Sequence, residues 1–343
     1  MRGKMDRKLL GVIDATTYQK GLEDLIQHRS LAAVPFGGRY RLIDFILSNM
    51  VNSGIKSVAI FPKNQYRSLM DHLGSGKNWD LNRKRDGLFF FPAPAEEKEI
   101  TSFNHFAANK DFFDRSNQQY ALISNCFTVC SMNFEPILDW HIKSGCDITE
   151  VRKDGRSLHM FLIKKSLLVE LFETREETGY TCMRDVVTDI NSPYRQCHYE
   201  FKGYAVMIDS ITTYFNESMK LLNPSIWKEL FLKNQPVYTK VKDEPPTRYF
   251  TGATVKNSVI ANGCLIEGTV ENSIISRAVK IGKGSVIKNS IIMQKCQIGE
   301  NCVLDSVVLD KDVKVNNGTM MYGTKELPYV VRKGTVQGAL MNS

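Results

Sequence analysis

Several features that would restrict this protein to special classes are absent from its sequence. No apolar run approaches the roughly 18 residues of a membrane-spanning helix. The charged N-terminal segment leads into no long apolar stretch or small-residue cleavage site of a secretory signal. No dense tract of lysine and arginine is interleaved with aromatic residues, although the net charge is +8. We therefore expect a cytoplasmic protein without a membrane or nucleic-acid partner, whose positive charge suits small phosphorylated ligands.

Cysteine pairs at metal-binding or redox spacing are also absent. None of the eight cysteines forms a Cys-x-x-Cys pair, and most, including Cys264, Cys296 and Cys302, stand in apolar contexts. Cysteine in such contexts behaves as a small core residue, and a zinc site requires paired ligands at suitable spacing. The sequence therefore predicts reduced, structural cysteines, no disulfide framework and no metal site.

The chain of 343 residues exceeds the roughly 250 to 300 residues at which a single core stops growing, so two domains are expected. Strand-like and helix-like runs alternate in the N-terminal part, which predicts an α/β fold with a mostly parallel sheet over residues 1–222. The strand-like runs are residues 8–13, 56–61 and 120–124, and the helix-like runs are residues 41–51 and 134–143.

A tetrapeptide of Asn or Asp, serine and two aliphatic residues recurs four times in the C-terminal part. The copies begin at residues 257, 272, 289 and 305, with spacings of 15, 17 and 16 residues. In a parallel β-helix, Gly and Asn tolerate positive φ at the turns while aliphatic residues stack inward. The repeat predicts a left-handed parallel β-helix with coils over about residues 251–320.

This β-helix belongs to a predicted C-terminal domain of residues 251–343. A linker is expected over residues 223–250, because a polar stretch there ends in Pro245-Pro246. Residues 251–343 contain no histidine, which argues against an acyltransferase with hexapeptide repeats that uses histidine as its general base.

Residues 35–45 (PFGGRYRLIDF), residues 65–69 (QYRSL) and residues 72–76 (HLGSG) closely resemble the ADP-glucose pyrophosphorylase family. That family also places a nucleotidyltransferase domain before a left-handed β-helix, so the resemblance covers nearly the whole chain. It implies a relative of the enzyme that joins glucose 1-phosphate and ATP into ADP-glucose and pyrophosphate for glycogen synthesis.

The phosphate-binding residues of that family are replaced here. Where the family has the loop Gly-Gly-x-Gly-Thr-Arg-Leu, this chain has Thr16-Thr17-Tyr18-Gln19-Lys20-Gly21-Leu22. Gly21 occupies the position of the arginine. The missing glycines are those that let backbone N–H groups approach phosphate. Leu31 replaces the lysine of the following Lys-Pro pair. Lys20 remains as a cation, for which a solvated surface position is the favoured interpretation.

The resemblance also implies two metal-binding aspartates, and both are replaced, by Cys126 and by Met207. Magnesium takes oxygen ligands, whereas thiol and thioether are soft ligands. Asp209 lies two residues after Met207. On a strand this spacing keeps the side chain on the same face but displaces its oxygens by about 6.5 Å. Between Thr149 and Arg156 the chain is several dozen residues shorter than the family, through either a true deletion or an omitted loop.

These replacements predict a regulatory subunit with no catalytic residue, metal or cofactor of its own. Its expected partner is a catalytic ADP-glucose pyrophosphorylase subunit, in a hetero-oligomer that we expect to be a tetramer. The alternative is an active sugar-phosphate nucleotidyltransferase with an altered site.

The resemblance also places His28, Arg29 and Arg41 near a pocket for phosphorylated effectors between the domains. The arginine fork suits phosphate. We favour an ordinary surface position for His28 and Arg29. For Arg41 we favour a role in effector binding.

Overall fold

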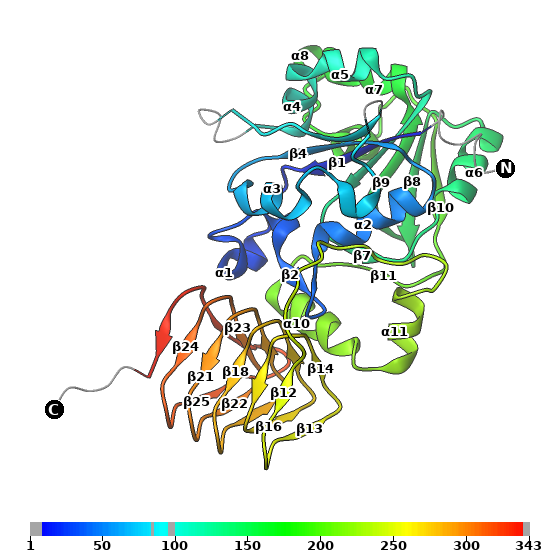
Figure 1. The fold of residues 1–343 in the computed structure, drawn as a ribbon. Helices are drawn as coiled ribbons and strands as arrows, with labels where there is room; N and C mark the ends of the chain where they lie inside the picture. Colours follow the sequence, from blue (N-terminus) through cyan, green and yellow to red (C-terminus); the bar gives the residue numbers. More distant parts are fainter. Residues whose placement is uncertain (1–8, 84–85, 95–99, 339–343) are drawn as a thin grey trace.

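A computed structural model describes residues 9–83, 86–94 and 100–338 of the chain. These residues form an α/β domain followed by a left-handed parallel β-helix, which confirms the predicted fold class (Figure 1). Among them, no helix is both long enough and apolar enough to cross a membrane.

A seven-stranded sheet forms the centre of the α/β domain. In spatial order its strands are β10 (Gln196–Glu200), β8 (Ile148–Lys153), β9 (Arg156–Lys164), β6 (Tyr120–Asn125), β1 (Leu9–Ala15), β4 (Ser57–Pro62) and β5 (Gly87–Phe90). Neighbouring strands are parallel except that β9 runs antiparallel to β6 and to β8. The strand-like runs of the sequence correspond to β1, β4 and β6, which lie side by side.

Helices cover both faces of this sheet, because alternate strand residues point to opposite sides. Leu9 and Ile13 of β1 join a core that includes α2, whereas Leu10 and Val12 join a core rich in phenylalanine from α4, α5 and α7. The helices are α1 (Glu23–Ile26), α2 (Leu42–Asn52), α3 (Arg67–Leu73), α4 (Ser102–Ala108), α5 (Lys110–Arg115), α6 (Glu135–Ser144), α7 (Lys165–Glu173), α8 (Arg175–Thr178), α9 (Met183–Thr188), α10 (Ile211–Lys220) and α11 (Pro224–Leu230). The two helix-like runs of the sequence correspond to α2 and α6.

The helix α2 fixes the framework segment of residues 35–45 against the sheet. Its N-terminus is capped by Asp44, whose carboxylate accepts the backbone N–H of Arg41 at 2.9 Å. A Cβ on Gly11 of β1 would lie 2.9 Å from the Met50 sulfur, so helix and strand approach each other closely. The chain before α2 forms the short hairpin of β2 (Pro35–Phe36) and β3 (Tyr40–Arg41).

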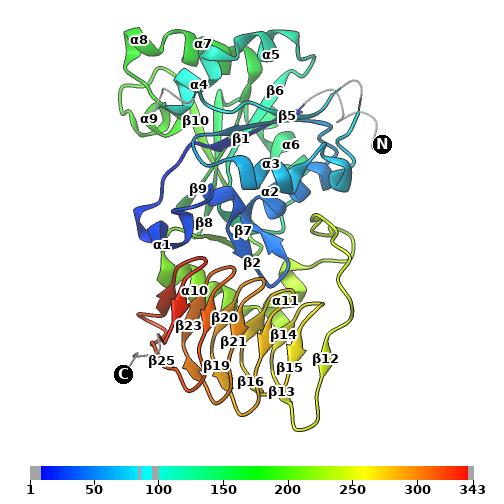
Figure 2. The same ribbon diagram turned by 60° about the vertical axis from the view of Figure 1, so that its left-hand side comes forward.

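The β-helix consists of three parallel sheets, which Figure 2 shows as a stack of coils below the α/β domain. The first sheet contains β12 (Arg248–Tyr249), β15 (Leu265–Ile266), β18 (Lys280–Ile281), β21 (Gln297–Ile298), β24 (Lys314–Val315) and β27 (Val336–Gln337). The second contains β13 (Thr254–Lys256), β16 (Thr269–Glu271), β19 (Val286–Lys288), β22 (Val303–Asp305) and β25 (Met320–Tyr322). The third contains β14 (Val259–Ile260), β17 (Ile274–Ile275), β20 (Ile291–Ile292), β23 (Val307–Leu309) and β26 (Tyr329–Val331). The coils therefore continue beyond the predicted residue 320.

The recurring serine of the tetrapeptide links one coil to the next. The Ser273 hydroxyl accepts the N–H of Ser290 at 3.0 Å, and the Ser290 hydroxyl accepts the N–H of Val307 at 3.1 Å. The last tetrapeptide copy, which begins at residue 305 in the sequence, is displaced by one residue in the structure, since Ile291 pairs with Val308 rather than with Val307. Ser306, with a φ of 57°, occupies the turn position that Asn289, with a φ of 45°, holds one coil earlier.

The third sheet of the β-helix packs against the α/β domain. Ile291, Met293 and Val308 are buried in the same core cluster as α2. Within the expected linker of residues 223–250, α11 is helical and β12 already belongs to the first coil. The core cluster around α2 is therefore shared by the two domains, while the inside of the β-helix forms a cluster of its own.

The prediction that all cysteines are reduced is wrong in the structure, which contains a disulfide between Cys146 and Cys197. These residues are 51 positions apart, but the pairing of β10 with β8 brings them together. The other six cysteines are free, and Cys264, Cys296 and Cys302 are buried inside the β-helix as predicted.

Candidate functional site

The loop after β1 occupies the place of the family's phosphate loop. At the end of β1, the Asp14 carboxylate accepts the N–H of Thr16 at 3.0 Å and the hydroxyl of Thr16 at 2.6 Å. It also accepts the Ser102 hydroxyl at 2.5 Å. Thr17 is exposed, and Gln19 begins a short 3-10 turn, in which its carbonyl accepts the Leu22 N–H at 2.9 Å. The carboxylate and hydroxyls at this loop are therefore engaged with each other.

Gly21, at the position of the family's arginine, lies against the chain that follows β11 (Ala205–Met207). A Cβ on Gly21 would be 2.7 Å from the Asp209 carbonyl oxygen and 3.1 Å from the Ser210 Cα. A Cβ essentially never approaches a backbone oxygen to 2.7 Å, so a side chain here would displace one of the two segments. The neighbouring Lys20 is exposed, in agreement with a surface role.

Cys126 is fully buried in the core that includes α2. Burial, and next the nearby Asp14 carboxylate, raise the pKa of the Cys126 thiol. The preceding Asn125 side chain accepts the N–H groups of Phe127 and Thr128, both at 2.9 Å, and thereby closes the turn. A neutral thiol in the core is a poor ligand for magnesium.

Met207 is half-buried on β11, which pairs antiparallel with β7 (Thr128–Cys130). Asp209 is exposed, and its carboxylate accepts the Thr213 hydroxyl at 3.0 Å at the start of α10. In the parts of the chain that the structure describes, no group of three or more His, Cys, Asp or Glu residues is arranged to hold a metal ion.

The short connection between β8 and β9 is a complete two-residue hairpin turn. Asp154 and Gly155 adopt φ values of 49° and 74°, as the tight turns of two-residue hairpins require. The Glu200 carboxylate accepts the N–H of Asp154 at 2.5 Å. The turn joins the two strands directly, with Lys153 paired to Arg156.

Leu31 is buried in the α/β core, next to a cavity of about 250 Å³. Thr16, Thr17 and Arg29 are among the residues that line this cavity. Arg29 itself is 3% exposed, and its Nη2 donates to both carboxylate oxygens of Asp310 at 2.7 and 2.9 Å. This ion pair joins the two domains, whereas His28 is exposed. Arg29 and Arg41 are near enough to interact electrostatically, but Arg29 is paired with Asp310, and His28 lines neither this cavity nor the cleft at Arg41.

Arg41 instead lies at a basic cleft between the domains, with a volume of about 240 Å³. Its Nη1 donates to the carbonyl and hydroxyl of Ser68 at 2.6 and 3.0 Å. Seven arginine or lysine side chains line the cleft against two carboxylates, an excess that favours an anion. The basic residues are Arg39, Arg41, Lys242, Arg277, Lys295, Lys311 and Lys333, and the acidic residues are Glu244 and Asp312.

Burial, more than mutual repulsion, lowers the pKa of two of these cations. Burial, followed by Arg41 and Arg29, lowers the pKa of Lys311 to about 7. Burial also lowers the pKa of Arg41 to about 10. An anion in the cleft would stabilise the protonated Lys311, so the cleft is poised to bind a negative group and a proton together.

Sequence reasoning missed the cleft residues of the β-helix, although the repeat contained a signal for them. Arg277, Lys295 and Lys311 each lie in the turn that follows the third-sheet strand of one coil, five or six residues after the start of a tetrapeptide copy. A basic residue at the same turn of successive coils forms a row along one side of a β-helix. The Asp14 and Ser102 contact at the end of β1 was also missed.

Comparison with known proteins matches both domains. Residues 20–155 match a model of the nucleotidyl transferase family, and residues 245–326 match a GlmU-like C-terminal hexapeptide model. The chain is 60% identical to the glycogen biosynthesis protein GlgD of Geobacillus stearothermophilus over 342 residues, which covers 98% of this chain and 100% of the relative. It is 55% identical to GlgD of Bacillus subtilis (strain 168) over 341 residues, covering 98% and 99% of the two chains.

More distant similarity extends to an enzyme. The chain is 30% identical to a glucose-1-phosphate adenylyltransferase of Thermosipho africanus over 296 residues, or 75% of this chain and 72% of the relative. The fold, the replaced loop and these identities agree. The chain belongs to the ADP-glucose pyrophosphorylase family, is similar to the GlgD proteins at 55 and 60% identity, and has a role related to glycogen synthesis.

Proposed function

We propose that this chain is a non-catalytic regulatory subunit of a glucose-1-phosphate adenylyltransferase complex, which tunes a catalytic partner in ADP-glucose synthesis. The observation that carries the proposal is the packing of Gly21, where a Cβ would meet the Asp209 carbonyl at 2.7 Å. From that position no side chain extends into a phosphate pocket unless the chain moves. The burial of Cys126 at the place of a metal-binding aspartate supports the same proposal.

The first experiment tests catalysis by the chain alone. Purified protein is incubated with glucose 1-phosphate, ATP and magnesium, with a catalytic homologue under the same conditions as the positive control. We expect no ADP-glucose above a heat-inactivated sample, because the reaction needs metal and cations to neutralise the triphosphate. Turnover that a chelator abolishes would instead support an active sugar-phosphate nucleotidyltransferase with an altered site.

The second experiment tests the partner. We propose that the chain assembles in the cytoplasm with a catalytic subunit, as a hetero-oligomer and most simply a tetramer. Titration of this chain into a fixed amount of catalytic subunit is followed by light scattering and by ADP-glucose formation. Allosteric coupling of roughly 1 to 3 kcal/mol corresponds to a change of about 5- to 150-fold in affinity. A mixed complex with unchanged rate, affinity and effector response would contradict a regulatory role, and the absence of any complex would contradict the partner.

The basic cleft is the proposed effector site of this subunit, with Arg41 as the residue carried over from the sequence. Its excess of cations suits a phosphorylated metabolite. Replacement of Arg41 by methionine should weaken binding of such a metabolite to the complex, whereas replacement of the exposed His28 should not. If the Arg41 and His28 replacements weaken metabolite binding equally, the cleft is not the effector site.

A further inference from the structure

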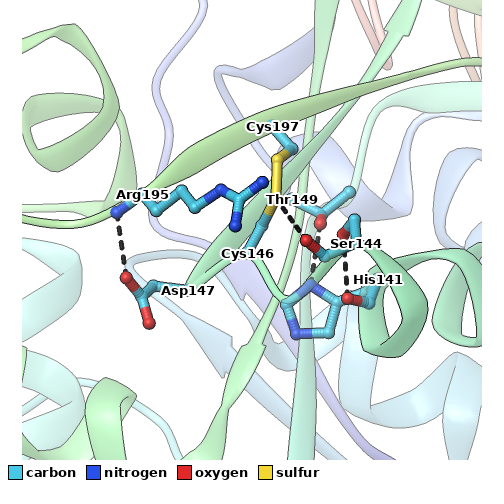
Figure 3. Close-up of a disulfide and its surroundings, with 7 residues drawn as sticks. All are labelled: His141, Ser144, Cys146, Asp147, Thr149, Arg195 and Cys197. Atoms are coloured by element: carbon cyan, nitrogen blue, oxygen red, sulfur yellow. Dashed lines mark hydrogen bonds between the residues drawn. A yellow bond between two sulfur atoms is a disulfide. The ribbon is translucent and has the colours of Figure 1, made fainter.

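The disulfide between Cys146 and Cys197 lies at one edge of the seven-stranded sheet. Cys197 is on the edge strand β10, and Cys146 is in the turn between α6 and β8 (Figure 3). Their Cα atoms are 6.1 Å apart, a separation usual for a disulfide. Cys146 is 5% exposed, whereas Cys197 is half-buried. Cys197 is therefore the more accessible partner for a small reagent.

We propose that Cys146 and Cys197 form a reversible thiol–disulfide site, which exchanges with low-molecular-weight thiols and disulfides and ties the edge strand β10 to the sheet. In oxidation, the Cys197 thiolate attacks one sulfur of a small disulfide and releases one small thiol. The Cys146 thiolate then attacks the Cys197 sulfur and displaces the second small thiol. The two protein thiols lose two electrons and two protons, and the small disulfide gains them. An excess of small thiol drives the same steps in reverse.

The surroundings of the pair favour this chemistry. A thiolate is the attacking species, and nearby positive charge favours its formation. Arg195 extends its guanidinium toward the disulfide in Figure 3, and its Nη1 lies 4.0 Å from the position of a Cβ on Gly145, the residue before Cys146. Arg195 and Asp147 are joined separately through the Arg195 backbone, whose N–H donates to the Asp147 carboxylate at 2.9 Å. The side chain can therefore be replaced without loss of that bond.

The other cysteines are poor competitors for exchange. Five of the six free cysteines are buried. Burial raises the pKa of the Cys130 thiol and of the Cys296 thiol to about 12. Cys182 is half-buried, and burial raises the pKa of its thiol as well. Exchange is thus directed to the pair at the sheet edge.

The position of the pair explains why its redox state can change the edge strand alone. The strand β10 has one neighbour, β8, and pairs with it over Gln196–Glu200. These backbone bonds do not involve sulfur, so the pairing survives reduction but loses its covalent anchor. A strand held by one neighbour opens locally at low free-energy cost. After β10 the chain leads directly to β11, which carries Met207.

The test uses the full-length chain in glutathione buffers of graded thiol-to-disulfide ratio. Samples are quenched in acid and alkylated, and the modified cysteines are mapped by mass spectrometry. We expect Cys146 and Cys197 to become protected together at one midpoint and to be released again by excess thiol. Hydrogen exchange of the amides of residues 196–200 should be at least about tenfold faster in the reduced chain. The change should be confined to this edge of the sheet.

Three variants refine the test. Arg195→Gln should slow disulfide formation severalfold, and Cys182→Ser should leave its rate unchanged. In Cys146→Ser/Cys197→Ser, the amides of residues 196–200 should exchange in every buffer as fast as they do in the reduced wild-type chain. The proposal is overturned if the pair stays open to alkylation in the most oxidising buffer, or if no thiol reduces it in the folded chain. Equal hydrogen exchange in both redox states would overturn it equally, and these wild-type measurements stand even if a variant fails to fold.

Discussion

The buried ion pair of Arg29 and Asp310 provides a direct test of how the two domains are held together. Both side chains are 2% exposed, and the guanidinium contacts both carboxylate oxygens at 2.7 and 2.9 Å. Replacing Arg29 by methionine leaves the Asp310 carboxylate buried, with the backbone N–H of Lys311 still donating to it at 2.7 Å. Breaking one partner of a buried pair costs about 3 to 5 kcal/mol. For a chain of this length that corresponds to a fall of about 4 to 7 °C in Tm.

The chain contains a matched control for this experiment. Arg332 and Asp24 also join the two domains, at 2.7 Å, but their side chains are 55% and 39% exposed. Exposed pairs contribute about 0 to 1 kcal/mol, so Arg332→Met should lower Tm by no more than about 1 °C.

Differential scanning calorimetry at one scan rate measures both changes. The double variant Arg29→Met/Asp310→Leu should recover most of the loss, because it removes the unpaired charge. A loss for Arg29→Met that is no larger than for Arg332→Met would refute the reasoning. So would a double variant in which the two single losses simply add.

Three further outcomes follow from the structure. Gly21→Ala should lower the free energy of unfolding by about 1 to 3 kcal/mol in thermal melts. The control Lys20→Ala should change it by no more than about 0.5 kcal/mol. An unchanged Tm for Gly21→Ala would mean that the loop is not packed on Asp209. Sulfate, whose charge is constant from pH 6 to 9, should bind the cleft more weakly as the pH rises above about 7. The reason is that Lys311, with its pKa of about 7, then loses its proton. Calorimetry should show that sulfate binding takes up protons in the wild type but not in the Lys311→Met variant. Removal of residues 251–343 should give an aggregated α/β domain, because Ile291, Met293 and Val308 complete its core; a monomeric fragment with a cooperative melt would contradict this.

The β-helix could be predicted from sequence because every coil repeats the same local requirements. Asn257, Asn272 and Asn289 each adopt a positive φ near 45° at the same turn. The one-residue displacement of the last copy could not be predicted, because Ser306 stands at the turn position of the asparagines while Asp305, one residue earlier, completes the same tetrapeptide pattern. The parallel sheet was predictable for a related reason, since its strands and helices alternate along the chain.

The contacts between distant segments could not be predicted in this way. Cys146 and Cys197 meet only because β10 pairs with β8, an order that no local pattern encodes. Arg29 was expected at the surface, but the β-helix covers it and supplies Asp310. The cleft likewise forms only when the turns of the β-helix close over Arg41. In each case the decisive partner comes from a segment far away in sequence.

The shared core also has a consequence during synthesis on the ribosome. The α/β domain is essentially complete at α11, yet its core lacks Ile291, Met293 and Val308 until nearly 80 further residues have been made. At about 5 to 20 residues per second this interval lasts roughly 4 to 16 s. Throughout that time the nascent chain exposes the apolar surface that later meets the β-helix. A ribosome-bound chain stalled shortly after residue 230 should therefore recruit holding chaperones. A chain stalled in an added C-terminal linker, with residues up to 338 outside the ribosome, should release them.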